Sequence, residues 1–145
     1  MGLIPLGVSG SSGSGGSVDL SALNTVVAPG QVYELSRWVG YTLRHLSLSL
    51  WVGSYYPHGA IAITNTMPKS LHPKDLDPQA LFSVLISPYT GTNIGPLILD
   101  FPPGLIWVGP GEHLYIVVYD FVHNSTGAAN TGQWALNMLW EPYSR

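Results

Sequence analysis

The stretch FPPGLIWVGPGEHLYIVVYDF, residues 101–121, decides the fold class of this chain. It predicts a strand at Leu105 to Val108, a tight turn at 109–111 and a second, longer strand at 113–120. Successive side chains of a strand point to opposite faces, and both faces of the second run are largely apolar or aromatic. We therefore expect residues 113–120 to be a central strand whose second face is covered by another layer or another subunit.

Runs with the β-strand period continue on both sides of this stretch. The clearest alternation is at 41–51, where leucines alternate with serines. Other strands are expected at 18–27, 31–38, 60–64, 81–87, 96–101 and 133–141. About eight strands without a helical period predict an all-β fold, a two-sheet antiparallel sandwich of jelly-roll or related Greek-key type. The side chains expected to point inward are Leu46, Leu48, Leu50, Val84, Ile86, Leu97, Leu99, Leu114, Ile116, Val118, Trp134, Leu136 and Met138.

Two polar segments interrupt the strands. Residues 55–59, YYPHG, predict a turn, and residues 65–80, NTMPKSLHPKDLDPQA, predict the one long loop. A loop of this length in a compact domain is usually functional or crosses between sheets.

The composition excludes several classes of partner. Charged residues make up 9% of the chain and the net charge is −3, so no basic patch is available for nucleic acid. No apolar run is long enough for a membrane-spanning helix, and the first residues lack the pattern of a signal peptide. The chain has no cysteine, which excludes disulfides and thiolate chemistry.

Residues 1–17, MGLIPLGVSGSSGSGGS, predict a flexible N-terminal arm that precedes a β-sandwich domain at 18–145. The arm has an apolar tip and a Ser/Gly tract typical of flexible tethers. We expect the tip to dock on a neighbouring protein; a disordered tail or an engineered linker is the alternative. The tip residues are Leu3, Ile4, Leu6 and Val8.

Patterns that carry chemistry are absent or incomplete. The turn 110–113 resembles the second histidine motif of cupins, but the His-x-His of their first motif does not occur. His72, Asp75 and Asp77 are too few ligands for calcium. No nucleophile elbow or phosphate-binding loop is present, and paired carboxylates have no supporting spacing. We therefore expect no enzyme activity, no metal and no cofactor.

Two sets of residues are candidates for recognition. The second face of residues 113–120 is the expected interface of a homo-oligomer, with a trimer favoured. Aromatic residues in loops could instead stack on sugar rings. The interface candidates are His113, Tyr115, Val117 and Tyr119, and the glycan candidates are Tyr55, Tyr56, His58 and Tyr89.

The apolar-tipped Gly/Ser arm, the uncharged sandwich and the terminal run WALNMLWEPY together resemble the small β-sandwich proteins that decorate or cement viral capsids. The resemblance implies an oligomer, often a trimer, that binds the major capsid protein on the outside of a tailed-phage head and stabilises the head by bridging neighbouring capsomers with its N-terminal arms. It also implies a virion protein that is assembled in the host cytoplasm. A receptor-binding or carbohydrate-binding sandwich, such as a tail-fibre head or a lectin-like module, is the alternative. If the arm is a tether, deleting residues 1–17 should leave the sandwich folded and oligomeric but abolish capsid binding.

Overall fold

The computed structural model describes residues 4–11, 25–28, 32–35, 39–53, 56–87, 93–126, 130 and 132–144. These residues form ten strands and one short 3₁₀ helix. The elements are β1 (Ile4–Ser11), β2 (Thr25–Ala28), β3 (Val32–Glu34), β4 (Tyr41–Val52), β5 (Pro57–Thr64), η2 (Pro73–Asp75), β6 (Phe82–Ile86), β7 (Asn93–Asp100), β8 (Tyr115–Val118), β9 (Val122–His123) and β10 (Gly132–Pro142).

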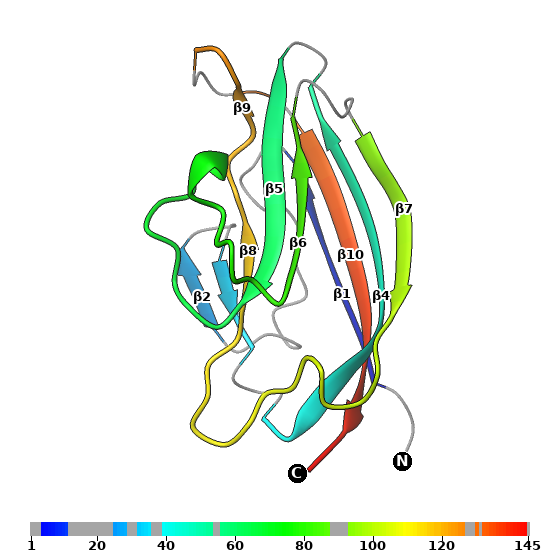
Figure 1. The fold of residues 1–145 in the computed structure, drawn as a ribbon. Coiled ribbons are helices and arrows are strands. Elements are labelled where there is room, and N and C mark those ends of the chain that lie inside the picture. Colours follow the sequence, from blue (N-terminus) through cyan, green and yellow to red (C-terminus); the bar gives the residue numbers. More distant parts are fainter. Residues whose placement is uncertain are drawn as a thin grey trace.

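The strands form two antiparallel sheets that pack face to face (Figure 1). Sheet A has the order β1-β10-β4-β7, and sheet B has the order β2-β3-β8-β5-β6, with β9 paired to β5. Along the chain, β4, β7 and β10 of sheet A alternate with elements of sheet B, which is the connectivity of a jelly roll. The predicted all-β sandwich is confirmed.

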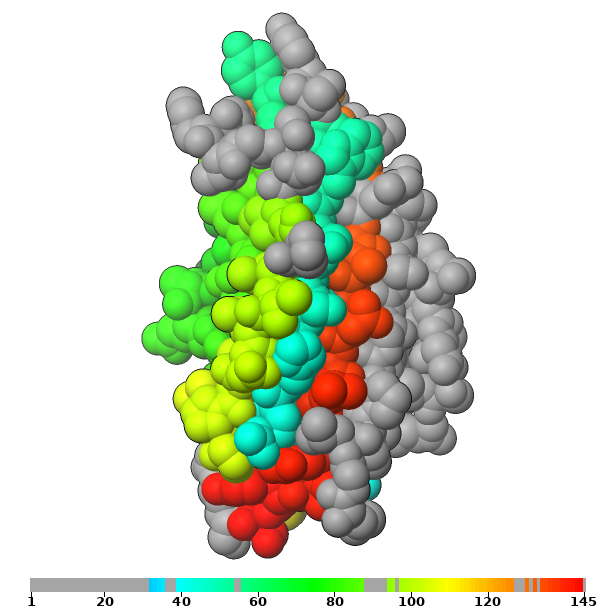
Figure 2. Space-filling model, turned by 90° about the vertical axis from the view of Figure 1, so that its right-hand side faces the viewer, coloured from blue at the N-terminus to red at the C-terminus, as the bar shows by residue number. Residues whose placement is uncertain are grey.

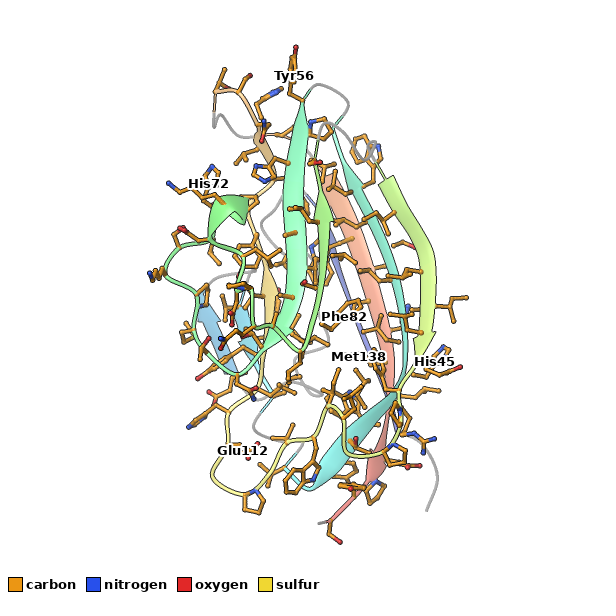
Figure 3. All side chains as sticks on the ribbon, viewed as in Figure 1. His45, Tyr56, His72, Phe82, Glu112 and Met138 are labelled. Atoms are coloured by element: carbon orange, nitrogen blue, oxygen red, sulfur yellow. The ribbon has the colours of Figure 1, made fainter. Side chains whose placement is uncertain are left out.

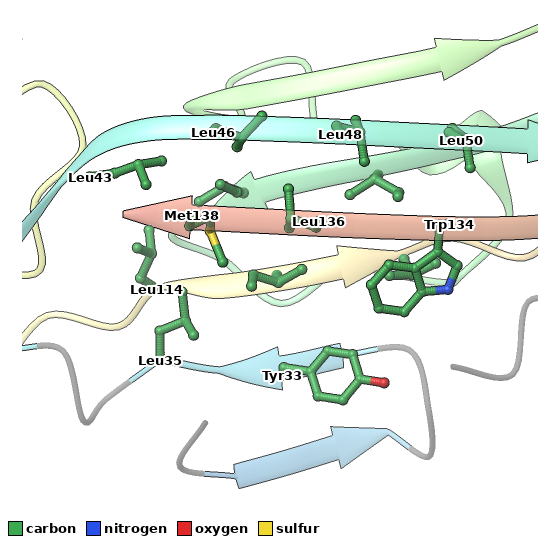
Figure 4. Packing of buried hydrophobic residues seen from close by; sticks show 14 of the residues in the cluster. Tyr33, Leu35, Leu43, Leu46, Leu48, Leu50, Leu114, Trp134, Leu136 and Met138 are labelled. Carbon is green, nitrogen blue, oxygen red and sulfur yellow. The ribbon is translucent and has the colours of Figure 1, made fainter. Parts of the chain in front are cut away.

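The core lies between the sheets, where leucines of β4 and alternate residues of β10 meet side chains of sheet B (Figure 4). Most side chains predicted to point inward are buried, and Val84, Leu97 and Leu99 at the edges are half-buried. The turn expected at 55–59 is partly wrong, because β5 begins at Pro57.

The predicted hairpin between 105–108 and 113–120 is wrong. The first run lies beside the start of β4 instead, where Trp107 forms a bridge with Thr42. The buried Thr42 hydroxyl donates to the Ile106 carbonyl and accepts from the Gly104 amide, both at 2.9 Å. These bonds satisfy a polar group that would be costly to bury alone. The turn at 109–112 does form, with the Glu112 amide donating to the Gly109 carbonyl at 3.0 Å.

The second face of β8 is covered by the chain itself. As predicted, β8 is central, because it pairs with β3 and β5. The 65–80 loop lies over its outer face, and the Asp120 amide donates to the Leu71 carbonyl at 2.7 Å. The loop is therefore a third layer, and no second subunit is needed to bury this face. The buried residues of this outer cluster are Val32, Ala60, Ala62, Val117 and Tyr119, with Leu71, Leu76, Ala80 and Tyr115 packed against them.

The expected arm and domain boundary need correction. Residues 4–11, assigned to the flexible arm, form β1, which pairs with β10 over eight residues from Ile4↔Trp140 to Ser11↔Gln133. Leu6 lies opposite Met138 and Val8 opposite Leu136. The sandwich therefore includes residues 4–11, and its boundary is not at residue 18. Leu3 lies outside the described residues.

The Tyr33 hydroxyl is buried without a hydrogen-bond partner among the described residues, and burial raises its pKa. Its ring lies 6.5 Å from that of Trp134. Because an unsatisfied buried polar group costs about 1–3 kcal/mol, Tyr33→Phe is expected to raise the free energy of unfolding by about 1 kcal/mol. Tyr33→Leu, which removes the ring, should lower it. Urea denaturation measures both, and a destabilised Tyr33→Phe variant would contradict the prediction.

Candidate protein-binding face

The outer face of sheet A is an exposed surface built by regular strands. Alternate residues of three neighbouring strands point away from the core and form it (Figure 2). Ser47 of β4 lies between two neighbours in the strand register, Ile98 of β7 on one side and Asn137 of β10 on the other. The described residues of this face are His45, Ser47, Ser49 and Trp51 of β4, Ala135, Asn137 and Leu139 of β10, and Ile98 and Asp100 of β7.

Charge on this face is confined to one end. His45 Nδ1 lies 2.7 Å from Asp100 Oδ1, at the end of β7 (Figure 3). At the same end, Arg44 and Glu141 form an ion pair. Over the rest of the face the described side chains are uncharged, and most are small.

Two large apolar side chains stand out from this surface. Ile98 is 60% exposed and Trp51 is 39% exposed. Three strands about 4.8 Å apart and about ten residues long cover roughly 500 Å², which is more than half of the area that one partner buries in a standard interface. Depletion of charge with exposed aromatic and aliphatic anchors is typical of the centre of a protein–protein interface.

The predicted oligomer interface is wrong for two of its four residues. Val117 and Tyr119 are fully buried beneath the 65–80 loop, so neither can contact another subunit in this conformation. Tyr115 is half-buried in the same cluster. His113 is exposed, stacks on Tyr115 and lies 2.7 Å from Glu34 Oε1. The physical reason is that a cover supplied by a distant loop of the same chain cannot be distinguished in the sequence from a neighbouring subunit.

The predicted glycan residues are only partly placed. Tyr55 and Tyr89 lie outside the described residues. Tyr56 is 48% exposed at the tip of β5, and its φ of 46° lies in the left-handed region that is uncommon for a residue with a bulky side chain (Figure 3). His58 points instead toward His72, with ring centroids 5.8 Å apart.

Burial, with a smaller contribution from the charge of His72, lowers the pKa of His58. Its Nδ1 is buried without a hydrogen-bond partner among the described residues. The unfolded chain therefore takes up a proton at a higher pH than the folded chain, and the free energy of unfolding should fall as the pH drops below roughly 6.5. His58→Gln should flatten this decrease in urea denaturation at pH 7.5 and 5.0. His45→Gln, which removes a histidine from sheet A, is the control, and an unchanged slope in His58→Gln would contradict the assignment.

No protein-family model matches the chain, and neither does any curated protein. Among solved structures, it is similar to a chain of sacbrood virus of honeybee in expansion state I, with a TM-score of 0.31 and 12% identity over 99% of this chain and 85% of that chain. A chain of the native-like genome-containing particle of DWV in acidic pH gives a TM-score of 0.25 and 13% identity, covering 75% of this chain and 57% of that chain. A chain of mud crab dicistrovirus gives a TM-score of 0.23 and 14% identity, covering 99% of this chain and 71% of that chain. All three are virus particles. At these TM-scores the description of the fold rests on its own strand pairing.

Neither a metal centre nor a membrane-spanning helix is found within the described ranges. No three His, Cys, Asp or Glu residues among them are grouped so that they could hold a metal ion. Similarly, no helix in that part of the chain is long and apolar enough to cross a membrane.

The outer face of sheet A was not singled out by sequence reasoning. Its signal in the sequence is the set of serines that alternate with leucines along 41–51, which are small and uncharged. Ile98 gave a second signal, since it lies between the inward Leu97 and Leu99 and breaks the expected polar alternation.

Proposed function

We propose that this protein is a structural protein of a virus particle, which binds the outside of a capsid and stabilises it through the outer face of sheet A. The observation that carries the proposal is the charge-poor face with Ile98 and Trp51 exposed on it. The uncharged and apolar side chains of such a face interact weakly with water, and their burial against another protein is favourable. The composition supports the same role, because charged residues are only 9% of the chain.

The major capsid protein is the proposed partner, and a homo-oligomer, with a trimer favoured, is the proposed state. The second face of β8 does not supply the interface of this oligomer, because the 65–80 loop covers it. Light scattering coupled to size exclusion measures the state, and a 15.6 kDa species at micromolar concentration would count against the oligomer. The tailed-phage head and the assembly in the host cytoplasm stay predictions from the sequence resemblance.

The binding test uses one substitution on the face and one matched control. Ile98→Arg places a charge where burial against a partner would leave it unpaired, which should weaken binding by about 10 to 100-fold. Leu105→Arg changes an equally exposed residue, 59% against 60%, in a loop outside the face and should bind normally. Co-sedimentation with undecorated capsids measures both. Equal binding by the two variants would refute the proposed face.

A carbohydrate-binding role is the second candidate, and Tyr56 is the observation that favours it. An exposed aromatic residue held at positive φ is a form of backbone strain that often marks a binding site. A glycan array with wild type and Tyr56→Ala separates the two functions. Glycan binding that Tyr56→Ala abolishes, without capsid binding, would favour this candidate over the structural role.

A further inference from the structure

The 65–80 loop contains a pocket of about 320 Å³ on the side of the molecule that carries sheet B. It is lined by residues 66–69, which precede η2, and by residues 74–78, which begin inside η2 and continue beyond it. Its volume is at the lower end of the range for ligand sites, and it is large enough for one or two side chains.

Hydrogen bonds fix the walls of this pocket. The Asp77 carboxylate accepts from the Thr64 hydroxyl at 2.6 Å and from the Gln79 amide at 2.8 Å. Asp75 accepts from the Ser70 hydroxyl. Leu76 packs on the outer cluster of sheet B, which anchors the loop to the sandwich. The pocket is therefore organised before any ligand arrives, which reduces the ordering cost of binding.

Two lysines in the pocket wall, unlike its two aspartates, have no side-chain partner of the described residues for their charged groups. Lys69 and Lys74 both line the pocket, and neither forms an ion pair with a carboxylate of the described residues. They are two of only five lysines and arginines in the whole chain. The two carboxylates nearby already accept bonds from hydroxyl and amide donors, so an incoming carboxylate can supply the acceptors that the two lysines lack.

Apolar groups complete the wall and indicate the class of occupant. Met67 is 48% exposed, and Pro68 and Pro78 line the pocket beside it. Two lysines are too few to neutralise a nucleic acid backbone in a chain of net charge −3. We propose that this pocket binds a peptide segment of a partner protein in which a glutamate or aspartate lies next to an apolar residue. This second contact lies on the sheet B side and goes beyond the face proposed above.

The test is an amide NMR titration of the full-length labelled protein with the peptide acetyl-Gly-Glu-Leu-Glu-Gly-amide. We expect saturable shifts at residues 66–69 and 74–78, with a dissociation constant on the order of 1 mM. The double variant Lys69→Gln/Lys74→Gln should weaken binding about five- to tenfold, because two exposed charge contacts are lost. Arg44→Gln, which removes a cation at the end of sheet A, should bind as the wild type does.

Several outcomes would overturn the proposal. They are an equal response to acetyl-Gly-Gln-Leu-Gln-Gly-amide, shifts that persist in the double variant, and shifts that map outside the loop. Equal shifts with acetate at the same carboxylate concentration would show a small-anion site only. Well-dispersed spectra of the double variant exclude misfolding as the cause. No capsid enters this experiment, so its result is independent of the test of the sheet A face.

Discussion

Deletion of residues 1–11 is expected to lower the free energy of unfolding by roughly 2–5 kcal/mol, a loss comparable to that of truncating one large core side chain. In the structure, β1 pairs with β10 over eight residues, and Leu136 and Met138 of β10 are fully buried. Without β1, this stretch of β10 becomes the edge of sheet A. Urea denaturation measures the loss. Deletion of residues 1–3, which precede β1, is the control and should leave the midpoint unchanged.

The same deletion should also promote association. An eleven-residue strand with alternating large apolar side chains would expose its unpaired amides and carbonyls, which is a template for edge-to-edge pairing. Light scattering at 10 to 100 μM should therefore show larger species for the deletion variant than for wild type. This replaces the sequence-based expectation that removing residues 1–17 leaves the sandwich untouched. A deletion variant with the wild-type midpoint and size would show that β1 adds nothing to sheet A.

Gly95→Ala is the second substitution with a large expected cost. Gly95 has a φ of +126°, a conformation open almost only to glycine. It lies in the β7 segment where the register with β4 shifts. An added Cβ would lie 2.8 Å from both the Leu48 carbonyl oxygen and the Ser49 Cα, which are backbone atoms that cannot rotate away. Strain of about 1–3 kcal/mol and steric overlap of about 1–3 kcal/mol give an expected loss of roughly 2–6 kcal/mol.

A matched glycine separates these two contributions. Gly111 has a φ of +77°, but a Cβ there would meet no atom within 4 Å. Gly111→Ala should therefore show the conformational cost alone, about 1–2 kcal/mol. Thermal and urea denaturation of the two variants compare them directly. Equal losses would mean that the contact with β4 contributes nothing and that the close approach at Gly95 is relaxed in solution.

Local periodicity was enough to predict the strands that form the core. The large apolar residues alternate from Leu46 to Leu50 in β4 and from Trp134 to Met138 in β10, and the structure buries Leu48 and Leu136 opposite each other. Partner choice was harder to predict. The Gly-Pro-Gly turn at 109–111 indicated a hairpin between its flanking runs, yet the first run lies beside Thr42, more than sixty residues away. A short sequence window contains no information on such a contact.

Two other errors have the same origin. Ile4, Leu6 and Val8 have the period of a strand, but the Ser/Gly tract that follows indicated a tether, so residues 4–11 were not assigned to a sheet. The cover of β8 comes from Leu71 and Leu76, two leucines in a loop that otherwise looks solvated. Both errors concern the choice of packing partner for a segment, and this choice depends on residues far away in the sequence.

The confinement of charge to one end of the sheet A face implies how its contacts respond to salt. Interactions between exposed charges weaken as the Debye length shortens, from about 8 Å at 0.15 M ionic strength to about 3 Å at 1 M. Burial of apolar surface does not weaken in this way. A contact centred on Ile98 and Trp51 should therefore hold at 1 M NaCl, while His45 and Asp100 at its margin contribute less there. Raising the salt would thus leave the protein attached through sheet A and release any segment held by Lys69 and Lys74. A change in ionic strength alone would then release the contact at the 65–80 loop while the contact through sheet A is kept.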